Sequence, residues 1–99
     1  MASYTDISPA DALAKQSEGI ALIDVRFDDE WAQVHAEGAQ HMPLGTFGLT
    51  DLPEGQLMFI CAVGGRSAQV AEAVAESGRE AFNVAGGTQA WIQAGLPTG

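Results

Sequence analysis

The sequence has a single cysteine, Cys61, among its 99 residues. One cysteine cannot close an internal disulfide, so nothing in the chain requires an oxidising compartment. The first residues contain neither the basic n-region nor the apolar h-region of a secretory signal, and no apolar run approaches the length of a membrane span. We therefore expect a soluble, cytoplasmic protein.

Basic residues are also scarce in this chain. Four Lys and Arg stand against 13 Asp and Glu, which gives a formal net charge of −9. Such a charge repels nucleic acids and anionic membranes, so we expect neither as a partner. Of the four cations, only Arg66 is expected beside the cysteine, so an anionic substrate must rely on local hydrogen-bond donors.

The sequence also lacks the usual signals for metals and nucleotides. His35 and His41 are six residues apart, with no second cysteine and no carboxylate at metal-ligand spacing. Gly86-Gly87 precedes a predicted helix, but neither a Walker lysine nor a G-x-G-x-x-G motif accompanies it. We expect no metal ion and no cofactor, and we interpret both histidines as packing or surface residues.

Apolar runs alternate with helical patterns along the whole chain, which predicts a single α/β domain over residues 1–99. Short, nearly continuous apolar runs are typical of parallel strands that are covered on both faces. Trp31 and Trp91 lie on predicted helices, where we expect them to anchor the core. The predicted strands span 20–25, 39–42, 57–61 and 81–84, the predicted helices span 8–19, 28–38, 67–77 and 88–94, and 44–55 is predicted to be irregular.

The stretch from Cys61 to Ser67 is the most informative part of the chain, because it combines the end of a strand, a tight loop and the start of a helix. Consecutive N–H groups around Gly64 and Gly65 favour an anion-binding nest, and ligands of parallel sheets bind beyond the carboxyl ends of the strands. A thiol in that place loses its proton more readily. A lone cysteine is most often a small buried hydrophobe, but a cysteine that merely ends a strand needs neither the glycines nor Arg66.

The loop therefore supplies the candidate site. Cys61 is the predicted nucleophile, and Arg66 is predicted to attract an anionic donor and to help hold the thiolate, with pairing to a surface carboxylate as the alternative. The expected substrate-binding residues are Ala62, Val63, Gly64, Gly65 and Ser67, mainly through their N–H groups. Ser67 is expected to cap the helix first and to reach the sulfur second.

Two further patterns bear on the chemistry. Asp24 and Arg26 follow a predicted strand and are interpreted as a structural ion pair, although Arg26 is also placed where it can border the mouth of the site. The spacing from Cys61 to Arg66 is C-x4-R. Tyrosine and dual-specificity phosphatases use C-x5-R, and the shorter loop is better suited to one additional sulfur atom than to a phosphoryl group.

The chain resembles single-domain rhodaneses, sulfurtransferases of the thiosulfate type. The resemblance rests on the loop Cys61–Ser67 and on Asp24-Val25-Arg26, and it implies an α/β fold with a mainly parallel five-stranded sheet and helices on both faces. It also implies a two-step reaction through a Cys61 persulfide. Further matching residues are Glu30, Trp31, His35, Gly38, Ala39, Met42, Pro43, Asn83, Val84, Gly86, Gly87, Ala90, Trp91 and the segment 94–97.

The chain departs from that family in two places. His35-Ala36-Glu37 stands where the family often has His-Ile-Pro, and Ala62 stands where rhodanese loops commonly have a basic residue. Ala62 favours a neutral or carrier-bound donor over thiosulfate, which is a dianion.

The first functional hypothesis is a sulfurtransferase that moves sulfane sulfur from thiosulfate, a persulfide or a polysulfide to cyanide or a thiol. The second is a carrier or binding module that exchanges sulfur only with a protein partner. A phosphatase or an arsenate reductase on the same fold is the third.

Overall fold

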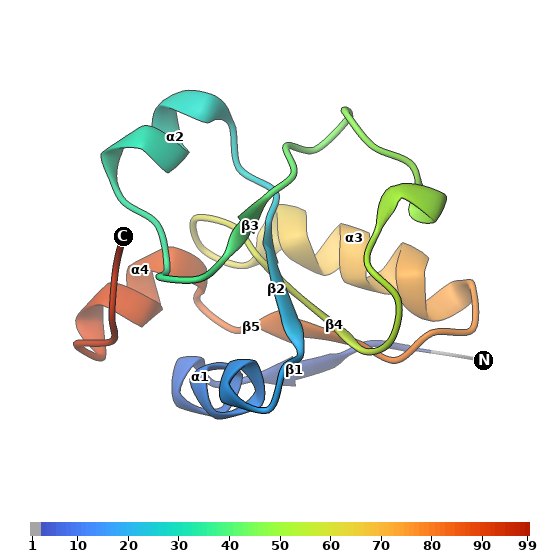
Figure 1. Ribbon diagram of the computed structural model, residues 1–99, viewed down its shortest axis with the longest axis horizontal. Helices are drawn as coiled ribbons and strands as arrows, with labels where there is room; N and C mark the ends of the chain where they lie inside the picture. Colours follow the sequence, from blue (N-terminus) through green and yellow to red (C-terminus); the bar gives the residue numbers. More distant parts are fainter. Residues whose placement is uncertain (1–2) are drawn as a thin grey trace.

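The computed structural model describes residues 3–99, and five parallel strands run through its centre in the order β1-β5-β4-β2-β3 (Figure 1). The predicted α/β class with a parallel sheet is thus confirmed. The four strands predicted from apolar runs are present with bounds within two residues of those expected. The strands are β1 (Thr5–Ile7), β2 (Ala21–Asp24), β3 (Gln40–His41), β4 (Leu57–Ile60) and β5 (Ala81–Val84).

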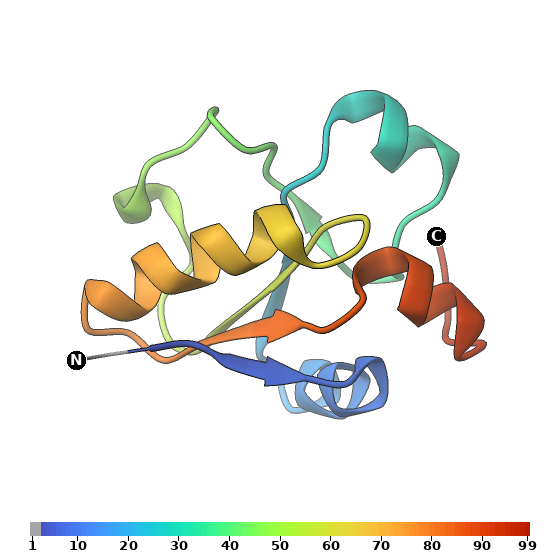
Figure 2. The same ribbon diagram turned by 180° about the vertical axis from the view of Figure 1, so that it is seen from behind.

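Helices cover both faces of this sheet (Figures 1 and 2). The helices are α1 (Pro9–Ser17), α2 (Asp28–Gln33), α3 (Gly65–Glu76) and α4 (Gly87–Gln93), with a 3-10 turn at Leu49–Asp51. The helix α3 covers one face of the sheet, and α1 and α4 cover the other. None of the helices within residues 3–99 combines the length and the apolar character that a bilayer crossing needs.

The strand β4 shows why the core has two halves. Leu57 and Phe59 pack with α3 on one side, whereas Met58 and Ile60 pack with α1 and α4 on the other. All four residues are completely buried. A strand with both faces covered needs apolar residues at every position, which is the physical reason for the continuous run in the sequence.

The half of the core that contains Met58 and Ile60 is anchored by Trp91. This residue is fully buried, as predicted, and donates its indole N–H to the Pro97 carbonyl at 2.8 Å. The prediction for Trp31 is wrong. Trp31 is only partly buried and stacks on the rings of His35 and His41, with centroids 3.6 and 4.6 Å away. The two histidines pack against an indole, as the interpretation of them as packing residues requires.

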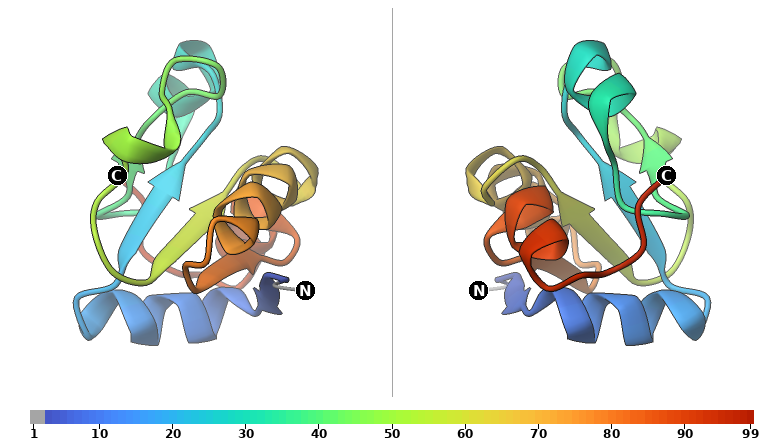
Figure 3. Two further views of the ribbon diagram at one scale, coloured as in Figure 1. Left: turned by 90° about the vertical axis from the view of Figure 1, so that its right-hand side faces the viewer. Right: turned by 90° about the vertical axis from the view of Figure 1, so that its left-hand side faces the viewer.

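The reason for this difference lies in the position of α2, which extends beyond the carboxyl end of β2 instead of covering the sheet (Figure 3). The helix also ends at Gln33, five residues before the predicted end. The chain becomes extended there because Ala36 enters the core and bridges Thr98, and the Glu37 N–H donates to the Pro97 carbonyl.

A buried ion pair attaches α2 to the sheet. Arg26 contacts Asp24 at 2.9 Å, the two side chains are 5% and 0% exposed, and the guanidinium also donates to the Val34 carbonyl just after α2. His41 bonds the Arg26 carbonyl at 2.8 Å. The structural ion pair predicted from the sequence is therefore present, and it connects β2 with the end of α2.

Replacing Arg26 with alanine should lower the free energy of unfolding by about 3–5 kcal/mol, because Asp24 would be left as a buried and unpaired carboxylate. Urea denaturation monitored by circular dichroism measures this change. Adding Asp24→Asn to Arg26→Ala should recover part of the loss, since no buried charge remains. A loss below about 1 kcal/mol for the single variant, the level of an exposed pair, would contradict a structural role for the pair.

Candidate active site

Cys61 directly follows β4, so it lies at the carboxyl end of the central sheet, where the loop to α3 begins (Figure 2). The loop closes at Gly64, whose φ of +107° lies in the left-handed region. A Cβ there would lie 3.4 Å from the Gly86 amide nitrogen, so a side chain would meet both conformational strain and close contact. Glycine is required at this position for the chain to turn from the strand into α3.

The start of α4 fixes the orientation of this loop. The Thr88 N–H donates to the Cys61 carbonyl at 2.8 Å, and the Gln89 N–H donates to the Ala62 carbonyl at 3.1 Å. Gly87 allows this approach, because a Cβ on it would lie 2.4 Å from the Cys61 carbonyl oxygen. Since a trans peptide holds its N–H opposite its C=O, the Cys61 and Ala62 carbonyls that face α4 turn the N–H groups of Ala62 and Val63 to the other side.

Several hydrogen-bond donors of the loop and of the first turn of α3 act on the Cys61 sulfur. The Gly64 N–H donates to Cys61 Sγ at 3.1 Å, and the Ser67 hydroxyl lies 3.3 Å from the same atom. Cys61 is only 1% exposed, and this burial raises the pKa of its thiol. The Ser67 hydroxyl and the amides of Ser67, Gly64 and Val63 act in the opposite direction and outweigh burial, so the net pKa lies below the ordinary value.

The expectation that Ser67 caps the helix is wrong. The helix α3 begins at Gly65, two residues earlier than predicted, and its N-cap is Gly64 without a side-chain hydrogen bond. Ser67 therefore lies inside the first turn, where its buried hydroxyl is free to reach Cys61. The left-handed Gly64 places the helix start earlier than a serine-cap pattern indicates.

Two residues that the sequence analysis did not assign to the site complete its hydrogen bonding. Asn83 of β5 is buried, and its Oδ1 lies 2.6 Å from Ser67 Oγ. Its Nδ2 donates to Asp6 Oδ1 at 3.0 Å and to the Gly64 carbonyl at 3.3 Å, which fixes the orientation of the amide. A polar residue inside an apolar strand needs a buried hydrogen-bond partner. The position of Asn83 between Phe82 and Val84 is therefore the sequence feature that could have indicated its role.

Arg66 forms an ion pair with a carboxylate, which was the alternative that the sequence analysis left open for it. Its two terminal nitrogens each lie 2.8 Å from a different oxygen of Glu30. The pair lowers the pKa of Glu30 to about 2 and raises that of Arg66, to which the nearby Cys61 thiolate adds a smaller effect. The guanidinium carbon also lies 5.6 Å from the centre of the Phe27 ring. The cation is thus beside the sulfur but already holds a carboxylate.

The remaining predicted residues form the frame of the loop. The Ala62 carbonyl accepts the Gln89 N–H, Gly65 begins α3, and the Val63 side chain is 63% exposed.

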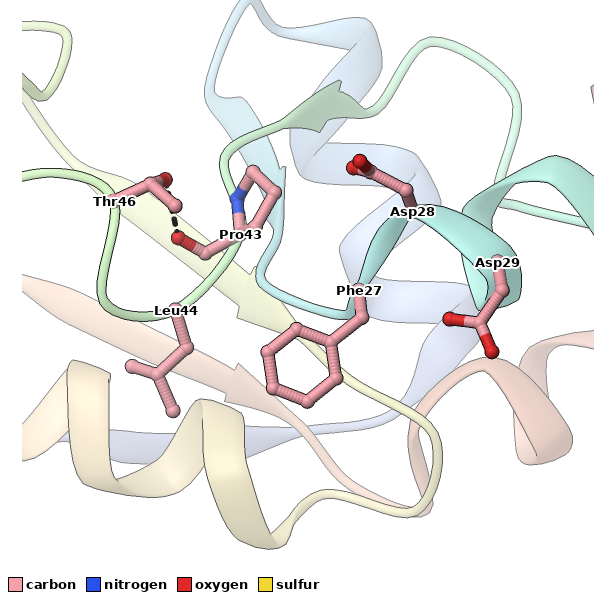
Figure 4. A pocket seen from close by; sticks show the side chains of 6 residues that line it. All are labelled: Phe27, Asp28, Asp29, Pro43, Leu44 and Thr46. Carbon is pink, nitrogen blue, oxygen red and sulfur yellow. Dashed lines mark hydrogen bonds between the residues drawn. The ribbon is translucent and has the colours of Figure 1, made fainter.

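A cavity of about 600 Å³ lies near this loop, between α2 and the segment after β3 (Figure 4). Its lining consists of Phe27, Asp28, Asp29, Pro43, Leu44 and Thr46.

The geometry agrees with what comparison with known proteins shows. Residues 8–94 match the family model of the rhodanese-like domain. The chain belongs to the rhodanese-like family. Thiosulfate sulfurtransferase GlpE of Haemophilus influenzae is 31% identical over 100 residues, an alignment that covers 96% of this chain and 94% of that protein.

Other relatives extend the family assignment. The probable adenylyltransferase/sulfurtransferase MoeZ of Mycobacterium tuberculosis is 39% identical over 80 residues, which cover 75% of this chain but only 20% of that protein. Among solved structures, a rhodanese-related protein from Thermoplasma volcanium superimposes with a TM-score of 0.86 at 28% identity and covers 97% of this chain and 98% of its own. The chain thus shares the rhodanese-like fold and has relatives named sulfurtransferases.

Replacing Ser67 with alanine should raise the pKa of Cys61, because the thiolate would lose a hydrogen bond from the Ser67 hydroxyl. The pH dependence of the rate of alkylation by iodoacetamide measures this pKa. Ser77→Ala at the end of α3 is a matched control that should leave the profile unchanged. An unchanged profile in Ser67→Ala would contradict the assigned role of this hydroxyl.

The same measurement tests Asn83. A hydroxyl has one hydrogen to donate, so Asn83 Oδ1 and Cys61 Sγ compete for that of Ser67. Asn83→Leu should lower the pKa of Cys61 in the wild-type background and should have no effect in the Ser67→Ala background. Equal shifts in both backgrounds would show that Asn83 acts on the sulfur without Ser67.

Proposed function

We propose that the protein is a sulfurtransferase that carries one sulfane sulfur on Cys61 as a persulfide. The observation that supports this most directly is the surrounding of Cys61 Sγ by N–H and O–H donors, which stabilise an anion at the carboxyl end of β4. Donors of the class are thiosulfate, persulfides and polysulfides, and the acceptors are cyanide or a thiol. The chemistry needs only a thiolate, so no metal or organic cofactor enters the proposal.

In the first step, the Cys61 thiolate attacks the outer sulfur of thiosulfate. A new S–S bond forms at Cys61, the bond to the sulfonate sulfur breaks, and its electron pair leaves with sulfite. The product is an anionic persulfide on Cys61. The Gly64 N–H and the other loop amides stabilise that charge in place of water.

In the second step, cyanide or a thiolate attacks the outer sulfur of the persulfide. The S–S bond to Cys61 breaks and its electron pair returns to Cys61 as the thiolate. The leaving thiolate is then stabilised by the Gly64 N–H and by the Ser67 hydroxyl. The same donors therefore assist the step in which charge returns to Sγ.

The alternative proposal is a sulfur carrier that depends on a protein partner and has little activity on small donors. It is supported by Ala62, which offers no positive charge to thiosulfate, and by Glu30, which occupies Arg66. Low turnover with small donors together with normal persulfide formation from a protein donor would favour it.

We propose the cytoplasm as the compartment, since a lone thiol that must stay a nucleophile is kept reduced there.

Incubation with thiosulfate or a polysulfide should add about 32 Da to the intact protein, the mass of one sulfur, and cyanide should remove it. Intact-mass spectrometry measures both changes. The Cys61→Ser variant is the control and should gain nothing. If that variant accumulates the same cyanide-labile adduct, Cys61 is not the carrier.

Glu30→Gln should raise kcat/KM for thiosulfate by about three- to fivefold, because Arg66 is released from a carboxylate and can bind the donor. Glutamine keeps an oxygen that can accept the Phe27 N–H, so the start of α2 is retained. Glu72→Gln makes the same charge change on the exposed face of α3 and should leave kcat/KM unchanged. Equal rates for Glu30→Gln and wild type would show that Arg66 does not limit thiosulfate use.

A further inference from the structure

The cavity near the active-site loop has its own chemistry. Phe27 and Leu44 both point toward α3, and the Asp28 and Asp29 side chains project from the start of α2 (Figure 4). Phe27 is 52% exposed and also contacts Arg66, which connects this cavity with the surroundings of Cys61. An apolar wall of this kind with two carboxylates beside it is suited to a ligand that is both apolar and positively charged.

The charged side chains of the protein also favour a positively charged ligand. Arg66, the cation beside the sulfur, is held by Glu30, and Arg26 is held by Asp24. Lys15 lies over the Phe82 ring at 4.6 Å, and Arg79 donates to the carbonyls of Pro53 and Gly55. Every Lys and Arg side chain is thus engaged within the protein. The Asp28 carboxylate, by contrast, is 93% exposed, and its contact with a His41 nitrogen is 3.8 Å long.

The dimensions of the surface favour a polypeptide over a small donor. The cavity of about 600 Å³ adjoins a second hollow of about 200 Å³, because Leu44 lines both. The second hollow continues along α3 and is lined by Gly45, Phe47, Leu49, Gln69, Val70 and Ala73 as well. A groove of this extent accommodates several residues of an extended chain, whereas thiosulfate would fill only a small part of it.

We propose that this groove binds a basic and apolar segment of the protein that exchanges sulfur with Cys61. In that partner, an arginine or lysine next to the sulfur-bearing cysteine would pair with Asp28 and Asp29, and a neighbouring apolar side chain would pack on Phe27 and Leu44. The inference rests on the proposed sulfurtransferase function for its purpose, but its binding step does not depend on persulfide chemistry.

The test uses three fluorescently labelled peptides of one length, each with a central Cys-Leu pair flanked by two arginines, two glutamines or two glutamates. Copies with serine in place of cysteine report binding alone, by fluorescence anisotropy with the unloaded protein. The arginine peptide should bind about tenfold more tightly than the glutamate peptide at low ionic strength, and added salt should reduce this ratio. Equal binding of the three peptides, or no binding of any, would overturn the proposal.

Two variants locate the effect on the protein. Asp28→Asn/Asp29→Asn should remove the preference for the arginine peptide. Phe27→Ser should weaken the binding of all three peptides by the same factor. Glu72→Gln/Glu76→Gln carries the same change of charge on α3 and should keep the preference, which excludes an effect of net charge. A preference that persists in Asp28→Asn/Asp29→Asn would place the binding site elsewhere and overturn the inference.

The cysteine peptides then measure sulfur transfer from the loaded protein by mass spectrometry, with the same expected order of rates. If no persulfide forms on Cys61 but the charge preference in binding holds, the sulfurtransferase proposal fails and the docking surface stands. If the persulfide forms and passes to all three peptides at one rate, the docking surface fails and the sulfurtransferase proposal stands.

Discussion

The arrangement of the site depends on two hydrogen bonds that lie outside it, from the Thr88 and Gln89 N–H groups at the start of α4 to the carbonyls of Cys61 and Ala62. A loop peptide presents either its oxygen or its N–H to the sulfur, and the oxygen would repel a thiolate. By donating to these two carbonyls, α4 turns the N–H groups of Ala62 and Val63 away from itself, and the Val63 N–H is one of the amides that lower the pKa of Cys61. Gly87 is what allows the two segments to approach this closely.

The parts of this structure that could be predicted are those in which one local pattern has one outcome. The apolar run 57–60 predicts a strand covered on both faces, and the glycines after Cys61 predict a tight turn into α3. Strand β1 could not be predicted from an apolar run, because it has three residues, two of them exposed, and it pairs with β5. Only the family resemblance indicated a fifth strand.

The candidate site also combines residues that a local pattern identifies with residues that only the fold brings together. The nucleophile and its amides lie within seven consecutive residues, so the sequence pattern identifies them. Asn83 and Asp6 reach the site from β5 and β1, 16 and 77 residues away from their partners Ser67 and Asn83. Glu30 reaches Arg66 over 36 residues. Such contacts follow from the order of the strands and the place of α2 beyond the sheet, which no local pattern encodes.

In the proposed sulfur transfer, the competition for the Ser67 proton would assist both steps at the buried thiol. While the negative charge is on Sγ, the sulfur would be the preferred acceptor for the Ser67 hydroxyl. In the proposed persulfide, where a second sulfur carries the charge one bond farther out, Asn83 Oδ1 at 2.6 Å would become the better acceptor. A donor fixed on Sγ would favour the free thiolate over the persulfide throughout and slow the loading step. A hydroxyl with two acceptors would donate to the thiolate when it forms and to Asn83 when the thiolate is consumed. In the proposed reaction this would reduce the difference in free energy between the thiolate and the persulfide.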